Sequence, residues 1–286
     1  MASDQKKTTM QIAMIGEEIL PLANVASEHL DRGIFFGDGV YEAMRSYNGR
    51  LTTLSEHLAR FERNLKAIDI TAIDITQIRS RVERAYSASK IPNAIIYFHV
   101  TRGAGYRSYL CGDLKPNFFL TVAELPDYTE IKKNGIRVMT CPDLRWKRCD
   151  IKTLNLLPNV LAKRAAVAGG FDDAILVGDD GLITEGASSA FFAIWEGSLR
   201  TTPLSANILG SVTRQFILKL AKKIDLSVIE KSLTVAEAGD AEELFIATSP
   251  RGIIPVVKFN AETIDAGKIG KYTKLLSESL DKFEDH

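Results

Sequence analysis

The sequence lacks several features that mark whole classes of protein. It has only three cysteines in 286 residues, and Cys111, Cys141 and Cys149 have spacings that suit neither a disulfide framework nor a zinc site. Its 36 basic residues are balanced by 36 acidic ones, so no basic surface for nucleic acid is indicated. No apolar run is long enough to cross a bilayer, and the opening MASDQKKTTM contains no apolar signal segment. We therefore expect a cytoplasmic protein that binds neither nucleic acid nor membranes.

Histidine is also scarce. His29, His57, His99 and His286 are scattered without the spacing of metal ligands, so we expect no bound metal. The simplest interpretation of His57 is a helix residue next to Glu56.

A hydrophobic content of 45% supports a sizeable core and two domains. Apolar residues at helical spacing predict a helix that Ser55 caps, and AIIYFHVTRG (94–103) and NFFLTVAEL (117–125) read as paired strands. The polar segment around Pro126 and Gly135 is the expected linker. We therefore expect a small N-terminal domain (1–126), a linker (127–134) and a large C-terminal domain (135–286).

The second half predicts helices at about 156–168, 211–224 and 234–241. Between and after them, DDAILVG, GLITEG, SAFFAIW and EELFIATS read as strands. Because strands and helices mix without regular alternation, the expected fold class is α+β.

Lys152 stands at the head of an apolar helix, in RCDIKTLNLLPNVLAKRAA. Lysine is seldom buried without a partner, so a surface position is the ordinary explanation. The apolar neighbours Ile151 and Leu154 favour a partly desolvated pocket instead. A lysine amine in such a pocket loses its proton more readily, which suits Schiff-base chemistry.

Two further motifs support a cofactor site. Glu185 ends an apolar strand just before Ser188 and Ser189, and a carboxylate there can hold the proton of a pyridine nitrogen. In NILGSVTRQF, a helix begins after Leu209 and Gly210, and its free amide groups together with Thr213 can bind an anion. Ser211 is equally explained as an ordinary helix cap. A reactive lysine, a partner for a ring nitrogen and a phosphate site together fit pyridoxal 5′-phosphate.

The motifs FFGDGVYEAMRSYNG, HLARFERN, DIKTLNLLPNVLAK, TEGASSAFF and LGSVTR resemble, in order and spacing, the fold-type IV pyridoxal-phosphate enzymes, or class IV aminotransferases. The resemblance spans residues 10 to 280, and the lysine and glutamate motifs are specific. The D-amino acid transaminases are the most similar subgroup. The resemblance implies two domains with the cofactor between them.

Carried over by position, the resemblance implies that Lys152 forms the Schiff base and moves the proton. Glu185 would hold the pyridine nitrogen, and Leu209 would pack on the ring. The phosphate would be bound by Arg60, Val212, Thr213 and Ser249. Ser188 and Ser189, which follow Glu185, would make further contacts to the cofactor. Without the resemblance, Arg60 would be interpreted as a surface arginine of its helix.

The expected contacts to the substrate carboxylate depart from the subgroup's pattern. Tyr41 matches the tyrosine, but TRGAGYRSYL places Arg107 and then Tyr109 where an Arg-x-His arrangement is expected. A guanidinium still binds a carboxylate with two hydrogen bonds, and a phenol donates one. A solvent-facing loop is the alternative interpretation of this segment.

The predicted activity is transamination between a D-amino acid, such as D-alanine, and a 2-oxo acid, such as 2-oxoglutarate. The resemblance also implies a homodimer in which the Arg107 loop reaches the neighbour's site. A branched-chain L-amino acid aminotransferase is the main alternative, followed by an R-selective amine transaminase or an aminodeoxychorismate lyase. The fold alone does not exclude a cofactor-free binding or structural protein.

Overall fold

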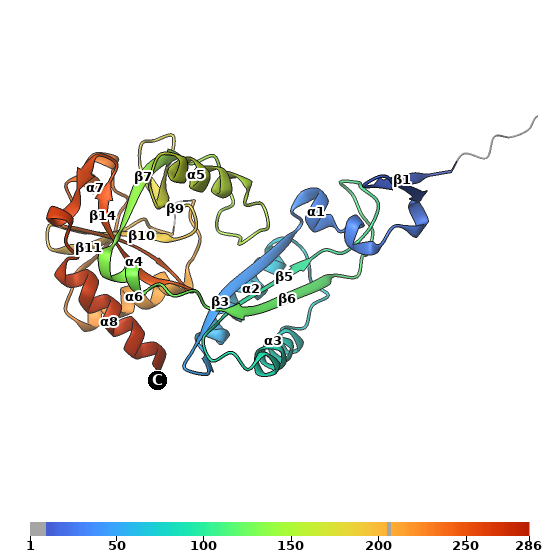
Figure 1. The fold of residues 1–286 in the computed structure, drawn as a ribbon, viewed down its shortest axis with the longest axis horizontal. Coiled ribbons are helices and arrows are strands. Elements are labelled where there is room, and N and C mark those ends of the chain that lie inside the picture. The colour runs from blue at the N-terminus through green and yellow to red at the C-terminus, as the bar shows by residue number, and fades with distance from the viewer. Residues whose placement is uncertain (1–9, 205–206, 286) are drawn as a thin grey trace, which may run out of the picture.

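The computed structural model describes residues 10–204 and 207–285. Two β-sheets dominate it and lie side by side along the long axis of the molecule (Figure 1). Helices and strands mix without a regular alternation, in agreement with the predicted α+β class. Within the described residues, no helix is both long and apolar enough to cross a membrane.

The N-terminal part begins with a two-stranded ribbon, β1 (Ile12–Ile15) and β2 (Glu18–Pro21). Two 3-10 turns, η1 (Leu22–Asn24) and η2 (Ser27–Leu30), lead to the short helix α1 (Arg32–Phe36). Asp31 caps α1 by accepting a hydrogen bond from the amide of Gly33, and Gly37 ends it in the left-handed conformation.

The first sheet is antiparallel, with the order β4-β3-β5-β6. Its strands are β3 (Gly39–Tyr47), β4 (Arg50–Leu51), β5 (Ala94–Thr101) and β6 (Asn117–Glu124). The helices α2 (Leu54–Ala67) and α3 (Ile75–Ser89) share a core cluster with it, because alternate residues of β3 and β5 point to the same face. The predicted pairing of the two apolar strands is confirmed, from Ala94 opposite Glu124 to Thr101 opposite Asn117.

The expected cap of α2 is wrong by two residues. The helix begins at Leu54, and its N-cap is Thr53, which has a φ of 53° and makes no side-chain cap bond. Ser55 lies inside the first turn, where its hydroxyl accepts a hydrogen bond from Arg79 instead. The apolar face of α2 is buried as its helical spacing predicts.

The second sheet has the order β12-β11-β10-β13-β14-β7-β8-β9, and β15 pairs with β14. Its strands are β7 (Ile136–Pro142), β8 (Asp173–Val177), β9 (Ile183–Gly186), β10 (Ala190–Trp195), β11 (Ser198–Thr201), β12 (Val228–Glu230), β13 (Glu243–Thr248), β14 (Gly252–Phe259) and β15 (Glu262–Thr263). Phe191 and Phe192 of β10 enter separate core clusters, because neighbouring strand residues point to opposite faces. The sheet is therefore packed on both sides.

The helices around the second sheet are α5 (Leu157–Ala168), α6 (Val212–Lys223), α7 (Val235–Gly239), the 3-10 turn η3 (Ile264–Gly267) and α8 (Lys271–Asp285). The predicted helices near 156–168, 211–224 and 234–241 correspond to α5, α6 and α7. A further helix, α4 (Thr129–Asn134), occupies the expected linker, and its Ile131 packs on a core cluster of the second sheet. The domain boundaries themselves stay a prediction.

The segment between β7 and α5, residues 143–156, joins the two sheets. The amide of Tyr41 in β3 donates to the carbonyl of Lys152 (3.0 Å), and the amide of Leu154 donates to the carbonyl of Gly39 (3.1 Å). Thr153 forms a bridge with Val40. These backbone bonds place Lys152 directly beside the first sheet.

Candidate active site

One cavity, with a volume of about 610 Å³, collects most of the residues predicted to form the site. Its lining includes Tyr41, Arg60, Lys152, Glu185, Ser188, Ser189, Leu209 and Ser249. These residues come from β3, α2, β9, the segment 143–156 and loops of the second sheet. The fold thus brings together groups that are far apart in the sequence.

The amine of Lys152 is hydrogen-bonded to the hydroxyl of Tyr41. Its Nζ lies 3.2 Å from the Tyr41 hydroxyl and 4.3 Å from the centre of the tyrosine ring. Among the described residues, Lys152 forms no ion pair with a carboxylate within 4 Å, and it is half-buried in the cavity rather than placed on the outer surface. An amine in this setting is available for chemistry with a molecule in the cavity.

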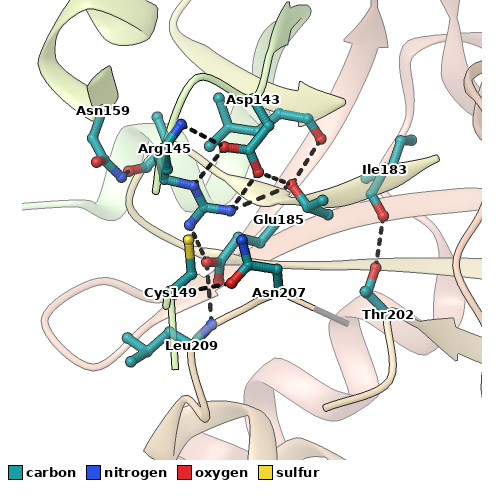
Figure 2. A network of polar contacts seen from close by, with 12 residues as sticks. Asp143, Arg145, Cys149, Asn159, Ile183, Glu185, Thr202, Asn207 and Leu209 are labelled. Atoms are coloured by element: carbon teal, nitrogen blue, oxygen red, sulfur yellow. Dashed lines mark hydrogen bonds and ion pairs between the residues drawn. The ribbon is translucent and has the colours of Figure 1, made fainter. Parts of the chain in front are cut away.

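Glu185 is buried at the end of β9, and a single oxygen of its carboxylate accepts its hydrogen bonds (Figure 2). Oε1 accepts hydrogen bonds from the Arg145 guanidinium and from the amide of Leu209 (3.2 Å). Within the described chain, Oε2 forms no hydrogen bond. Burial raises the pKa of the Glu185 carboxyl above its ordinary value, and Arg145 opposes that rise.

Arg145 is a site residue that sequence reasoning missed. It is nearly buried and binds Asp143 through two hydrogen bonds, Nε to Oδ1 (2.8 Å) and Nη2 to Oδ2 (2.7 Å), while it also contacts Glu185 (Figure 2). The hydroxyl of Thr184 donates to Asp143 (2.8 Å). The segment DLRWKR contains no periodicity that singles out Arg145, so only the fold identifies it.

Arg60 is buried, which excludes its interpretation as a surface arginine of the helix. Its Nε and Nη2 donate to the two oxygens of Glu42 (2.7 and 2.6 Å), and Nη1 donates to the carbonyl of Gly210 (3.2 Å). His57, one turn earlier on α2, contacts the same carboxylate at 2.7 Å and is fully buried. Arg60 is therefore fixed beside the start of α6, where a phosphate is expected.

Glu42 is the second group that sequence reasoning missed. Burial alone would raise the pKa of its carboxyl, but Arg60 and His57 outweigh that effect and hold the pKa at about 2. A signal for it existed in the sequence. Glu42 lies two residues from both Val40 and Met44 on a strand, so its side chain shares their buried face and needs cationic partners there.

The helix α6 begins with an ordinary N-cap, and the hydroxyl of Thr213 in its first turn lies beside another hydroxyl. The Ser211 side chain accepts from the amide of Arg214 (3.2 Å), so the cap interpretation of Ser211 is correct. The hydroxyls of Thr213 and Ser249 lie 3.0 Å apart. Ser249 lines the cavity, whereas Val212 and Thr213 are buried and are not among its lining residues.

Cys149 also lines the cavity, beside Arg145 and Lys152. Burial raises the pKa of its thiol to about 11. Because the thiolate is the reactive form, Cys149 is a poor nucleophile in this setting.

Arg107 and Tyr109 do not lie in the cavity of their own chain. They belong to the loop 102–116, at the end of the first sheet that is remote from the second sheet (Figure 1). Phe36 of α1 lies under both side chains, 5.3 Å from the Arg107 guanidinium and 5.5 Å from the Tyr109 ring. Arg32 donates to the carbonyls of Ser108 (2.5 Å) and Tyr109 (3.3 Å). The helix α1 therefore holds this loop in place.

The family model described as amino-transferase class IV matches residues 39–259 of this chain. The chain is 34% identical to a D-alanine aminotransferase of Staphylococcus haemolyticus over 277 residues, which covers 96% of this chain and 98% of that protein. It is 36% identical to a D-alanine aminotransferase of Bacillus licheniformis over 252 residues, covering 87% and 89% of the two chains.

Among solved structures, the chain resembles a branched-chain amino acid aminotransferase of Escherichia coli. The TM-score is 0.84 at 21% identity, with 93% of this chain and 92% of the other covered. At that identity the likeness concerns the fold.

Proposed function

Because the chain belongs to the class IV aminotransferases, we propose that it transfers an amino group between a D-amino acid, such as D-alanine, and a 2-oxo acid. The observation that carries the proposal is the sequence likeness to D-alanine aminotransferases over nearly the whole chain. The likeness to the branched-chain enzyme is one of fold and does not favour an L-amino acid.

Enzymes of this class depend on pyridoxal 5′-phosphate, and the cavity fits that cofactor. Lys152 offers a half-buried amine for a covalent link. Glu185 is anchored through Oε1, which leaves Oε2 for a ring nitrogen. The buried hydroxyl of Ser189 has no hydrogen-bond partner within the described chain, so a polar group of a bound molecule can satisfy it.

Each residue has a distinct proposed task. When bound, the cofactor supplies an electron sink for the charge that develops at the substrate Cα. Lys152 removes the proton from that Cα through its Nζ, and the Tyr41 hydroxyl, 3.2 Å away, orients the amine. Glu185 remains a carboxylate beside Arg145 and keeps a proton on the ring nitrogen. Leu209 lines the cavity and would pack against the ring of the bound cofactor.

The proposed phosphate ligands surround the start of α6. Arg60 supplies the positive charge, and Glu42 fixes its orientation. The amides of Val212 and Thr213 and the hydroxyls of Thr213 and Ser249 complete the set, because a helix N-terminus favours an anion. Ser188 and Ser189 border the cavity on the Glu185 side.

We further propose a homodimer in which Arg107 and Tyr109 bind the substrate carboxylate in the partner's cavity. Both are remote from the cavity of their own chain. Arg107 has no carboxylate partner among the described residues, and Tyr109 is 81% exposed. A guanidinium and a phenol held open in this way can bind a carboxylate together. Tyr41 contributes from the chain that owns the cavity.

A cytoplasmic location fits the cysteine chemistry. Cys111 is exposed, Cys141 and Cys149 are buried, and all three are free thiols. Free thiols persist in reducing compartments. Fractionation of cells that express the chain, followed by immunodetection, tests this part of the proposal.

The absorption spectrum of the purified holoenzyme tests the proposed activity. D-Alanine or L-leucine is added in the absence of a 2-oxo acid, and the visible band of the bound cofactor is followed. Loss of the band with D-alanine alone is expected. Loss with L-leucine alone would contradict the D-amino acid assignment, and a preparation that binds no pyridoxal phosphate would contradict the whole proposal.

A further inference from the structure

Basic side chains outnumber acidic ones on the cavity wall. Among the described residues that line the cavity, Glu185 is the only carboxylate. The basic lining residues are Arg60, Arg145, Lys152, Lys163, Arg164 and Arg251. The proposed function uses the first three and leaves Lys163, Arg164 and Arg251 without a task.

Two of these three cations, Lys163 and Arg251, share one buried carboxylate, that of Asp173. Lys163 Nζ lies 2.9 Å from Asp173 Oδ2, and the same oxygen accepts from Arg251 Nη1 (3.2 Å) and Nη2 (3.3 Å). Asp173 is fully buried, and the neighbouring Asp172 is already paired with Arg137. Arg164 makes no hydrogen bond or ion pair within the described part of the chain. Two positive charges therefore remain unbalanced at this part of the wall.

The cluster adjoins the proposed cofactor contacts on two sides. Arg251 follows Ser249 by two residues, so their Cα atoms lie within about 7 Å of each other. On the other side, Ala187 follows Glu185 by two residues, and its amide donates to the carbonyl of Ala174, next to Asp173 (2.9 Å). A molecule that occupies the cavity near Glu185 and Ser249 is therefore close to the unbalanced charge.

We infer that Lys163, Arg164 and Arg251 form a second anion subsite, which binds the distal carboxylate of a dicarboxylic substrate. The inference rests on the proposed function, because it assumes that a 2-oxo acid or amino acid enters this cavity. Arg164 makes the contact, since its guanidinium is unpaired and can bind a carboxylate with two hydrogen bonds. Lys163 and Arg251, held by Asp173, supply the surrounding positive potential. Four- and five-carbon diacids are then preferred over monoacids of the same length.

The phosphate of the cofactor is also an anion, so the same basic residues could bind it in place of a substrate carboxylate. The two are distinguished by the affinity for pyridoxal phosphate. A subsite for the substrate leaves that affinity unchanged when Arg164 is replaced, whereas a phosphate ligand lowers it.

Calorimetric titration of the holoenzyme with glutarate and pentanoate tests the inference directly. The two acids have the same chain length and differ in the second carboxylate. We expect wild-type protein to bind glutarate more tightly, and Arg164→Gln and Lys163→Gln to weaken glutarate about five- to tenfold without changing pentanoate. Lys163→Gln leaves Arg251 on the buried Asp173 and so preserves the fold. Lys222→Gln, an exposed lysine of α6 outside the lining, is the matched control.

Three results would overturn the subsite: equal binding of glutarate and pentanoate by the wild type, unchanged glutarate binding in Arg164→Gln, or loss of pyridoxal-phosphate affinity in that variant. Steady-state kinetics adds an independent readout. The KM for 2-oxoglutarate rises in Arg164→Gln, while that for pyruvate does not. If the protein transaminates nothing but still selects glutarate through Arg164, the proposed function fails and the subsite stands.

Discussion

Single side chains in this protein owe their chemistry to the charges buried beside them. The buried carboxylate of Glu185 is ion-paired with Arg145, and Arg145 is also bound to Asp143. Glu185 therefore has a charged partner although its surroundings are apolar. Arg60 is fixed by Glu42 in the same way. Each pair costs desolvation, and that cost is offset only while both partners are present.

Replacing Glu185 with Gln separates the effect of this residue on cofactor binding from its effect on the catalytic rate. The phosphate contacts are untouched, so Glu185→Gln retains the cofactor, but a neutral amide no longer holds a proton on the ring nitrogen. We expect kcat with D-alanine to fall about 100-fold, the size of effect typical of a lost electrostatic contact in an active site. Cofactor content after dialysis and steady-state rates measure the two effects. Glu262→Gln, an exposed carboxylate on β15, is the control, and an unchanged kcat in Glu185→Gln would refute the assigned role.

The buried Glu42 predicts a pH dependence of stability. Its pKa is lowered from 4.5 to about 2 in the folded protein, so it stabilises the fold above the unfolded pKa and loses that contribution as the pH falls through the folded one. The wild type should therefore lose about 3 kcal/mol of unfolding free energy between pH 5 and pH 2 that Glu42→Gln does not lose. Denaturant unfolding across this range measures the difference. Glu62→Gln, half-exposed on the same helix and ion-paired with the exposed Lys66, should follow the wild type, because a surface ion pair contributes little to stability. Parallel curves for the wild type and Glu42→Gln would contradict the prediction.

Among the elements, the short helix α1 has a role that its length does not suggest. It spans Arg32–Phe36, and both terminal side chains contact the loop that carries Arg107 and Tyr109. Its position depends on the Asp31 cap, whose other oxygen accepts from Thr101 at the end of β5 (2.8 Å). The loop is thus tied to the sheet through α1.

Shortening the side chain under the loop should weaken substrate binding. Phe36→Leu removes the aromatic face beneath both Arg107 and Tyr109, while Lys152 and Glu185 are unaffected. We expect the KM for D-alanine to rise about three- to fivefold with little change in kcat, since stacking of this kind contributes about 1 kcal/mol. Ile34→Ala, which shortens an exposed side chain of the same helix, is the matched control. A fall in kcat without a change in KM would show that α1 acts on something other than carboxylate binding.

The predicted elements were found where local periodicity was strong. The strands of the β5/β6 pair and the helices α5 and α6 follow from apolar spacing and β-branched runs. The start of α2 was placed wrongly, because Thr53 adopts a left-handed conformation that no capping pattern signals. The helix α4 was missed because its polar sequence reads as a linker, whereas its Ile131 packs on the core.

For the whole molecule, the remote position of Arg107 predicts that subunits complement one another. Lys152→Ala and Arg107→Gln each remove one part of the proposed site, and neither variant should be active alone. In a mixed dimer, one cavity has Lys152 from one subunit and Arg107 from the other. We expect mixing after mild denaturation and refolding to restore about a quarter of wild-type activity, because half of the dimers are mixed and half of their sites intact.

Sedimentation analysis of the same samples gives the oligomeric state. Refolded Lys152→Ala alone and Arg107→Gln alone are the controls. An active monomer, or a mixture as inactive as its components, would contradict shared active sites.

The sequence by itself predicted the chemistry that we propose for this protein. Lys152, Glu185 and the start of the helix after Gly210 stand in local patterns that suit a reactive amine, a carboxylate and an anion site, and the helices and strands that carry them follow from the spacing of apolar residues. Local patterns suffice there because each depends on residues a few positions apart.

Only the tertiary structure decided which groups meet. Lys152 and Tyr41 are 111 positions apart, and Arg145 and Glu185 are 40 apart. Arg107 and Tyr109, by contrast, are held away from the cavity of their own chain. A contact between distant segments depends on sheet order and backbone pairing, and a buried charge finds its partner only once the fold has removed both from water. For that reason Arg145 and the cluster around Asp173 could be recognised only in the folded molecule.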